Sequence, residues 1–488
     1  MFTFDNSYAR DLPGLYADWQ PATVPAPRLL KLNHALATEL GLDADALQGP
    51  DAAALFAGNR VPAGAQPLAQ AYAGHQFGGF SPQLGDGRAL LLGEVIDRQG
   101  RRRDIAFKGS GRTPFSRGGD GKAALGPVLR EYLVGEAMHA LGIPTTRALA
   151  AATTGETIVR DRPLPGAVLT RVAASHVRVG TFQYLAARGQ HEQVRQLADH
   201  VIRRHDPSLA DHPERYLELL RAVAQRQAAL VAQWMNVGFI HGVMNTDNMT
   251  VSGETIDYGP CAFMEAFDPQ AVFSSIDHGG RYAYENQPLI ARWNLARLAE
   301  TLLPLLADDP DTAVQRATEV IDAFPGWFAQ RLLQGQRAKL GLATSQPDDA
   351  GLVADWLALL HTQAVDFTLA WRLLADAAEG RVQPLRDLFV DRNALLPWLE
   401  RWQQRAAAEG LDPAARAAGM RQASPLVIAR NHRVEEALAA AVDHDDLAPF
   451  ERLLAAVQRP FDDQAGFERY AEPAPRELTA RYQTFCGT

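Results

Sequence analysis

The stretch "HGVMNTDNMTVSGETIDYG" at residues 241–259 gathers oxygen-bearing side chains within a short distance along the chain. Asp247 and Asn248 are adjacent, and Asp257 follows after a short polar run. The Gly-Glu pair in that run favours a turn, so we expect residues 249–256 to form a hairpin that brings Asn248 and Asp257 together. Mg²⁺ prefers hard oxygen ligands and keeps several waters, so these two side chains and phosphate oxygens would suffice to bind it.

The same stretch matches part of the protein-kinase catalytic pattern, in which H-R-D-x-x-x-x-N precedes a D-F-G triplet. His241 and Asn248 take the first and last positions of the loop, but Val243 stands where the catalytic Asp is expected. Asp247 is therefore the candidate base for an attacking hydroxyl. We interpret His241 as a structural brace. The simpler alternative is an Asx-type turn, in which Asp and Asn side chains cap local backbone.

Composition limits the class of protein. The chain has 488 residues, 47% of them hydrophobic and 22% charged, which is ordinary for a soluble protein with more than one domain. A net charge of -9 and dispersed basic residues argue against nucleic-acid binding. The two cysteines have neither disulfide-scaffold nor zinc-site spacing. No signal-peptide pattern and no membrane-length apolar run is present, so we expect a cytoplasmic protein without membrane contact, and a monomer.

The periodicity predicts an α+β fold in which a β-rich part precedes a helical part. Strand-like runs at 89–96 and 103–111 flank a polar turn and predict a hairpin. A helix is expected at 127–141, with Pro in its first turn. Three more strand-like runs follow, "RALAAATT", "ETIVRD" and "GAVLTRVA", and then long amphipathic helices at 191–205, at 211–237 and from about 290 to the end.

This order of elements is that of a protein-kinase-like bilobal fold with a helical C-terminal extension. The expected boundaries are a leader that packs on the core, an N-lobe, a C-lobe with the catalytic and metal loops, and an extension with a cysteine-bearing tail, at residues 1–60, 61–180, 181–320 and 321–488. Within the leader, "PRLLKLNHALATELGL" at 27–42 has helical spacing and ends near a Gly.

Several residues upstream of the loop are candidates for phosphate binding. Gly85 and Gly87 precede a strand, where glycine lets backbone N–H groups approach phosphate oxygens; a simple turn is the alternative. Lys108 ends "IAFK", a pattern typical of a nucleotide-binding Lys that pairs with a helix Glu. Glu131 and Glu136 are both available on the following helix and would face differently, so the partner stays open.

Two further segments carry basic residues. The loop 109–124 has a glycine-rich background and carries Arg112, Arg117, Asp120 and Lys122. A mobile loop over an anion and a solvated surface loop are equally compatible with it. Arg171 ends a strand-like run, and Arg178 follows shortly after. The planar guanidinium group binds phosphate oxygens in a bidentate manner, whereas surface ion pairs are the alternative role.

Taken together, these motifs resemble the selenoprotein O (SelO, YdiU) family of pseudokinases over nearly the whole chain. The resemblance rests on "QFGGFSPQLGDGR", "FKGSGRTPFSRGGDGKA", "LREYL", "HGVMNTDNM" and "TIDYGP", in that order. It implies a kinase-like fold that holds ATP in a flipped orientation. The implied activity is transfer of AMP from ATP to Ser, Thr or Tyr hydroxyls of proteins, with release of pyrophosphate.

The resemblance also implies roles for matching residues. Glu131 would pair with Lys108, Asp247 would accept the proton, and Asn248 and Asp257 would bind Mg²⁺, although Mn²⁺ accepts the same ligands. The residues implied in ATP binding are Gly85, Gly87, Arg88, Lys108, Asp120, Gly121, Arg171, Arg178 and Asp257.

A redox role is implied for a cysteine near the C-terminus, and Cys486 fits that position. In some bacterial members this cysteine pairs with one in the region that corresponds to Phe273, where this chain has none. Pairing between Cys261 and Cys486 therefore stays open. The acceptors expected from the resemblance are proteins, redox-related ones among them.

Two other functions remain as alternatives. A phosphotransferase acting on a protein or a small molecule would use Asp247 as a relocated base. A non-catalytic nucleotide-binding scaffold would need no base at all, and the intact metal-ligand candidates argue against it.

Overall fold

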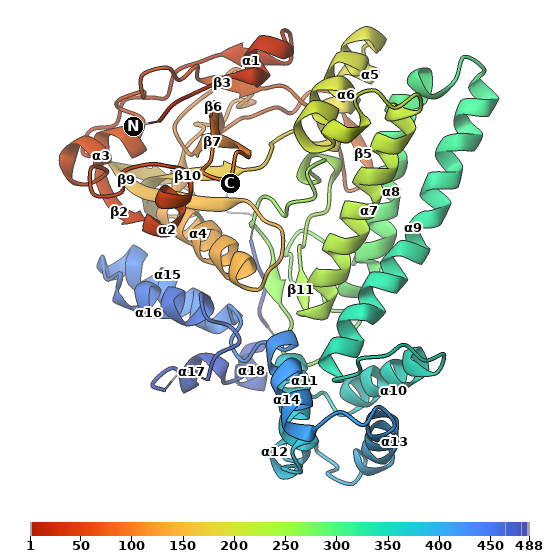
Figure 1. Cartoon of the computed structure of the whole chain (residues 1–488). Coiled ribbons are helices and arrows are strands. Elements are labelled where there is room, and N and C mark those ends of the chain that lie inside the picture. The colour runs from red at the N-terminus through yellow and green to blue at the C-terminus, as the bar shows by residue number, and fades with distance from the viewer. Residues whose placement is uncertain (1, 464, 480, 486–488) are drawn as a thin grey trace.

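The computed structural model describes residues 2–463, 465–479 and 481–485. Its N-terminal part contains an antiparallel sheet, and its later part is built of helices (Figure 1). The sheet runs in the order β1-β3-β6-β7-β10-β9-β2, and β8 also pairs with β10. The bounds of its strands are β1 Tyr16–Asp18, β2 Arg28–Leu32, β3 Leu68–Gln70, β6 Ala89–Ile96, β7 Arg102–Lys108, β8 Ala123–Ala124, β9 Arg147–Val159 and β10 Pro163–Ala173.

The predicted hairpin of residues 89–108 is present. Strands β6 and β7 pair antiparallel, with Ala89 opposite Lys108. Lys108 therefore lies at the open end of the hairpin, opposite to its turn. The runs "RALAAATT" and "ETIVRD" were predicted as two separate strands, which is wrong, because together they form the single strand β9. Gly155 adopts a φ of +75°, and the pairing with β10 shifts at this point. The chain therefore passes through a bulge there instead of ending the strand.

The expected helix at 27–42 is only partly correct. Residues 28–32 form β2, which adds to the free edge of β9, and the helix α2 is limited to His34–Glu39. Asn33 begins this helix, because its side chain accepts a hydrogen bond from Leu36 N (3.1 Å). Pairing with an available sheet edge outweighs helical periodicity in so short a run. With β1 and β2, residues 1–60 supply both outer strands of the sheet.

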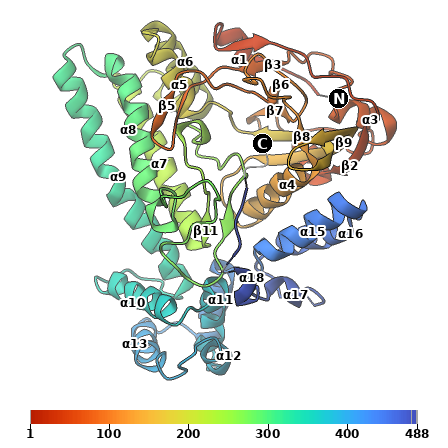
Figure 2. The ribbon, with the colours of Figure 1, turned by 180° about the vertical axis from the view of Figure 1, so that it is seen from behind.

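Helix α4, Leu125–Ala140, packs on β9 and β10 and confirms the helix expected at 127–141. The long helices α7, α8 and α9 lie side by side on the far side of the central loops (Figures 1 and 2). The remaining helices of this half and the leader are α1 Ser7–Asp11, α3 Gly49–Phe56, α5 Val179–Ala186, α6 His191–His205, α7 Arg215–Asn236, α8 Gln287–Leu306 and α9 Pro310–Lys339.

The C-terminal helices form two groups, one below α9 and one against α4 (Figure 1). Their bounds are α10 Asp349–Thr362, α11 Phe367–Ala378, α12 Gln383–Arg386, α13 Leu396–Ala407, α14 Pro413–Ala423, α15 Asn431–His444, α16 Ala448–Val457, α17 Glu468–Ala471 and α18 Arg476–Thr479. Arg430 is fully buried and bonds to Glu265 and Asp366, which joins this region to the core. Within the described ranges, no helix has the length and apolar character needed to cross a bilayer.

Short strands hold the central loops. β11 Phe239–Ile240 pairs with β12 Ala262–Phe263 on either side of the stretch 241–259. A separate hairpin, β4 Gly74–Gln76 with β5 Gly79–Ser81, stands apart from the large sheet. The stretch 241–259 is thereby enclosed between the sheet, the long helices and this hairpin.

Candidate functional site

A cavity of about 470 Å³ lies between the sheet and the stretch 241–259. The catalytic, ATP-binding and metal-binding residues predicted from the sequence line it, which brings together positions far apart in the chain. These residues are Gly85, Gly87, Arg88, Lys108, Asp120, Gly121, Glu131, Arg171, Arg178, Asp247, Asn248 and Asp257. Cys486 lies outside the described residues.

A compact ion cluster occupies the inner wall of this cavity. Lys108 Nζ lies 2.5 Å from Glu131 Oε2 and 2.7 Å from Asp257 Oδ1. Arg171 Nη1 donates to the same two carboxylates, at 3.1 Å and 2.8 Å. Arg178 Nη1 donates to Asp257 Oδ2 at 2.8 Å. Three cations thus surround two carboxylates, and Asp86 Oδ1 lies 3.9 Å from Arg178 Nη2. A polyphosphate could replace these carboxylates as the partner of the three cations.

The other helix glutamate has a different partner. Glu136 accepts from Nε and Nη2 of Arg147, both at 2.7 Å, on the far face of α4. The pairing that the sequence left open therefore falls to Glu131. Burial alone would raise the pKa of Asp257, but Lys108 and the two arginines hold it well below its usual range. Asp257 also has a φ of +63°, which is rare for a residue with a side chain.

Asp247 stands at one side of this cluster and differs from it electrostatically. Its Oδ2 accepts a hydrogen bond from Gln76 Nε2 at 3.2 Å, while its buried Oδ1 has no hydrogen-bond partner among the described residues. Burial raises the pKa of Asp247 to about 6. A carboxylate with a near-neutral pKa and an unpaired oxygen on a cavity wall is suited to accept a proton.

Asn248 and Asp257 fit a metal ion that also binds phosphate. The side-chain NH₂ group of Asn248 donates to Val243 O at 3.0 Å, which leaves Oδ1 as the ligand atom. In the part of the chain that the structure describes, no three His, Cys, Asp or Glu side chains are grouped to hold a metal alone. The donor set therefore suits Mg²⁺ delivered with a nucleotide rather than a resident ion in a protein cage.

The hairpin expected at residues 249–256 is absent. Thr250 bridges instead to Arg178, and Thr255 bridges to Thr145, so each side of the turn pairs with a distant segment. Thr250 Oγ1 closes the turn by accepting from Glu254 N (3.1 Å) and donating to Glu254 O (2.7 Å). Long-range partners outweighed the local pairing that the turn residues suggested.

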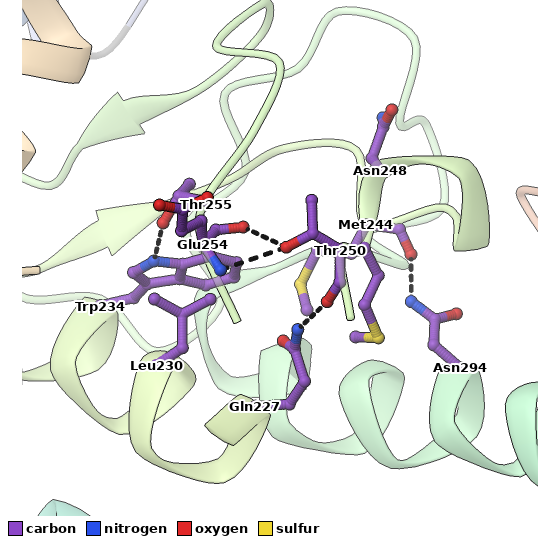
Figure 3. A pocket seen from close by; sticks show the side chains of 10 residues that line it. Gln227, Leu230, Trp234, Met244, Asn248, Thr250, Glu254, Thr255 and Asn294 are labelled. Atoms are coloured by element: carbon purple, nitrogen blue, oxygen red, sulfur yellow. Dashed lines mark hydrogen bonds between the residues drawn. The ribbon is translucent and has the colours of Figure 1, made fainter. Parts of the chain in front are cut away.

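Figure 3 shows how the long helices hold this loop from behind, around a small second pocket. Gln227 Nε2 donates to Thr250 O (2.7 Å), and Trp234 Nε1 donates to Thr255 Oγ1 (2.9 Å), both from α7. Asn294 Nδ2 of α8 donates to Met244 O (2.9 Å). No sequence motif marks these supports, and a polar group on an otherwise apolar helix face is the one signal that could have indicated them.

His241 has the bracing role expected from the sequence. Its Nε2 donates to Ile256 O (2.9 Å), and its Nδ1 accepts from Val243 N (3.4 Å). Burial lowers its pKa, so the ring is neutral and links the two halves of the loop.

The glycine-rich segments pack against each other at the cavity rim. A Cβ at Gly85 would lie 2.4 Å from the Phe115 ring, and one at Gly87 would lie 2.9 Å from Phe115 O. The loop 109–124 is therefore folded onto residues 85–87. Asp120 also lines the cavity, and it forms an ion pair with Arg160 at 2.9 Å. This ion pair shares no residue with the ion cluster around Asp257.

A buried series of hydrogen bonds behind Arg171 was not predicted from the sequence. Arg171 Nε donates to His176 Nε2 (3.1 Å), and His176 Nδ1 lies 2.8 Å from Asp104 Oδ2. Asp104 is held in turn by Arg204. Because His176 Nε2 accepts, Nδ1 must carry the proton and donate to Asp104. Burial lowers the pKa of His176, which favours this neutral form.

Cys261 is buried, and burial raises the pKa of its thiol, in agreement with an ordinary core cysteine. The C-terminal tail returns to the region of Phe273, because Thr484 N donates to Phe273 O (2.8 Å). At the position where some family members have the partner cysteine, this chain has Phe273, whose ring packs against Tyr482.

Comparison with known proteins agrees with this geometry. The sequence profile of the family described as "Protein adenylyltransferase SelO" matches residues 2–458. The chain belongs to the SelO family. It is 62% identical, over the full length of both chains, to a protein of Cereibacter sphaeroides named "Protein nucleotidyltransferase YdiU". Proteins of the same name from Chromobacterium violaceum (61% identity, 98% of this chain and 100% of theirs) and Rhizobium rhizogenes (60%, 99% and 97%) are also similar. The family predicted from the motifs is confirmed.

Proposed function

We propose that this member of the SelO family is a protein adenylyltransferase that transfers AMP from ATP to Ser, Thr or Tyr hydroxyls and releases pyrophosphate. The proposal includes a kinase-like bilobal fold, with lobes at 61–180 and 181–320, a leader at 1–60 and an extension at 321–488. The match to an adenylyltransferase family and the names of the relatives support the reaction class.

The position of positive charge carries the proposal. Arg171 and Arg178 are only 2% and 3% exposed, so these two cations of the cavity wall are buried away from solvent. The β- and γ-phosphates bear most of the charge of ATP, and they bind best where cations are desolvated. ATP would then enter with its terminal phosphates innermost, and the α-phosphate would lie towards the acceptor side.

Each step follows from groups on the cavity wall. The acceptor oxygen attacks the α-phosphorus, the bond from that phosphorus to the β-phosphate oxygen breaks, and pyrophosphate departs. Asp247, whose carboxylate lines the cavity, takes the hydroxyl proton. Lys108, Arg171 and Arg178 move from Asp257 to the phosphates and offset charge on the leaving group. Mg²⁺, or Mn²⁺, bound by Asn248 and the released Asp257, would supply further charge neutralisation.

ATP labelled on either the α- or the γ-phosphate distinguishes the candidate functions. Incubation with Mg²⁺ and an acceptor protein should give labelled protein from α-labelled ATP alone. Label from γ-labelled ATP alone would refute the proposal in favour of a phosphotransferase. ATP binding without transfer from either label would favour a nucleotide-binding scaffold.

A further inference from the structure

The hairpin β4–β5 lies directly on the catalytic loop. Its first arm bonds to three consecutive loop residues, so its position relative to Asp247 is fixed. These bonds run from His75 N to Thr246 Oγ1 (2.7 Å), from Gln76 Nε2 to Asp247 Oδ2 (3.2 Å) and from Phe77 N to Asn245 Oδ1 (3.1 Å). A Cβ at Gly74 would lie 2.4 Å from Asp247 Oδ1, so the hairpin and the base are in close contact.

The tip of this hairpin carries an unfavourable residue. Phe77 and Gly78 both have positive φ, +51° and +86°, as in a type I′ turn. Asn or Gly is preferred at the first of these positions, and an aromatic residue there is a clear outlier. The Phe77 ring is nevertheless 39% exposed and is packed on one side only, against Tyr282 at 5.1 Å. Local stability therefore does not explain a phenylalanine at this position.

Two more residues beside Phe77 are suited to bind a partner. Ile276 is 49% exposed, and it lines the same cavity as Phe77 and Asp247. The Arg281 guanidinium lies beside the turn, 3.7 Å from where a Cβ of Gly78 would be. Arg281 forms no ion pair with the described residues, and its guanidinium lies 5.0 Å from the centre of the Trp293 ring, which leaves its charge available to an acid. An exposed ring and an exposed aliphatic side chain thus line the cavity that contains Asp247, and a cation lies beside the turn that carries the ring.

We propose that Phe77, Ile276 and Arg281 bind the polypeptide segment that presents the acceptor hydroxyl to Asp247. The ring of Phe77 packs against an apolar side chain next to the hydroxyl-bearing residue, and Arg281 favours a carboxylate close to it. The occupant is a protein segment because the surface is continuous with the cavity and the relatives are named protein nucleotidyltransferases. This inference rests on the proposed function only in taking a protein as the acceptor.

Phe77→Asn separates a binding role from a structural one. Asn suits the turn geometry, so the variant should fold with an equal or higher melting temperature. Loss of an aromatic contact at the centre of a binding surface should weaken acceptor binding about tenfold. The probe is fluorescein-labelled, dephosphorylated α-casein, measured by anisotropy in the presence of α,β-methylene-ATP. Arg281→Gln is a second variant on the same surface. Val390→Asn, at an exposed position of the extension, is the matched control.

The inference predicts weaker casein binding for both surface variants, an unchanged dissociation constant for the nucleotide, and no effect of Val390→Asn. In the transfer assay, the variants should raise KM for casein more than they lower kcat. Casein binding that is absent, or equal in the wild type and Phe77→Asn, would overturn the inference. If casein binding depends on Phe77 but the label comes from the γ-phosphate, the surface stands and the proposed AMP transfer fails.

Discussion

His176 offers a sharp test of how the cationic wall is positioned, because two substitutions keep opposite halves of its bonding. His176→Gln retains an acceptor near the place of Nε2 and so keeps a partner for Arg171 Nε. His176→Asn retains a donor near the place of Nδ1 and so keeps the bond to Asp104. The backbone N–H of His176, which donates to Asp104 Oδ2 at 2.8 Å, is unaffected by either change.

The expected magnitude follows from the bond that is lost. A hydrogen bond involving a charged group contributes about 1.5–3 kcal/mol, and the donor left unpaired here is buried. If Arg171 must be held in place to bind the triphosphate, His176→Asn should lower kcat/KM for ATP about tenfold to a hundredfold. His176→Gln should stay within a fewfold of the wild type.

Initial rates of AMP transfer over a range of ATP concentrations measure this effect, with melting temperatures recorded alongside. Most of the change should appear in KM for ATP, since Arg171 acts on binding and charge neutralisation. A purely structural role would lower the two melting temperatures without separating the two KM values. Equal losses in the Gln and Asn variants, or no loss in either, would refute the positioning role of His176.

Three further predictions concern the rest of the chain. Arg430→Met leaves two buried carboxylates without their cation, so it should lower the free energy of unfolding in urea by about 3–5 kcal/mol. The KM for ATP should stay unchanged. A loss of stability below about 1 kcal/mol would contradict this prediction. Burial lowers the pKa of Lys339 to about 7, so between about pH 7 and 10 the unfolded chain binds more protons than the folded one. Stability should therefore fall as the pH drops from about 10 to 7 and level off below 7, where Lys339 is protonated in both states. Lys339→Met should remove this slope, and an equal slope in the variant would contradict the assignment. In Cys486→Ser, the remaining thiol of Cys261 is 1% exposed with a raised pKa, so it should react with a thiol reagent only after denaturation; rapid reaction of the native protein would show that it is accessible.

The sequence was most informative where chemistry fixes residue type and spacing. Lys108, Asp247, Asn248 and Asp257 could be chosen because phosphate and metal binding demand particular groups in a particular order. The structure brings all four to one cavity. The resemblance also selected Glu131, which the residues alone left undecided.

The sequence was least informative where distant segments meet. Thr250 and Thr255 pair with remote residues, which overturned the expected hairpin between them. The roles of His176 and Gln76 were not predicted, because they depend on tertiary contacts with Arg171 and Asp247. Residues 28–32 became a strand because a sheet edge was available, which no local pattern shows.

The mass gained by the acceptor tests the central claim most directly. Wild-type protein and Asp247→Asn are incubated with ATP, Mg²⁺ and dephosphorylated casein, and the modified residues are identified by mass spectrometry. The account predicts an adenylyl group on Ser, Thr or Tyr with the wild type, and severe loss of that product with Asp247→Asn while ATP binding is retained. A phosphoryl group in place of the adenylyl group, or full activity of Asp247→Asn, would contradict it.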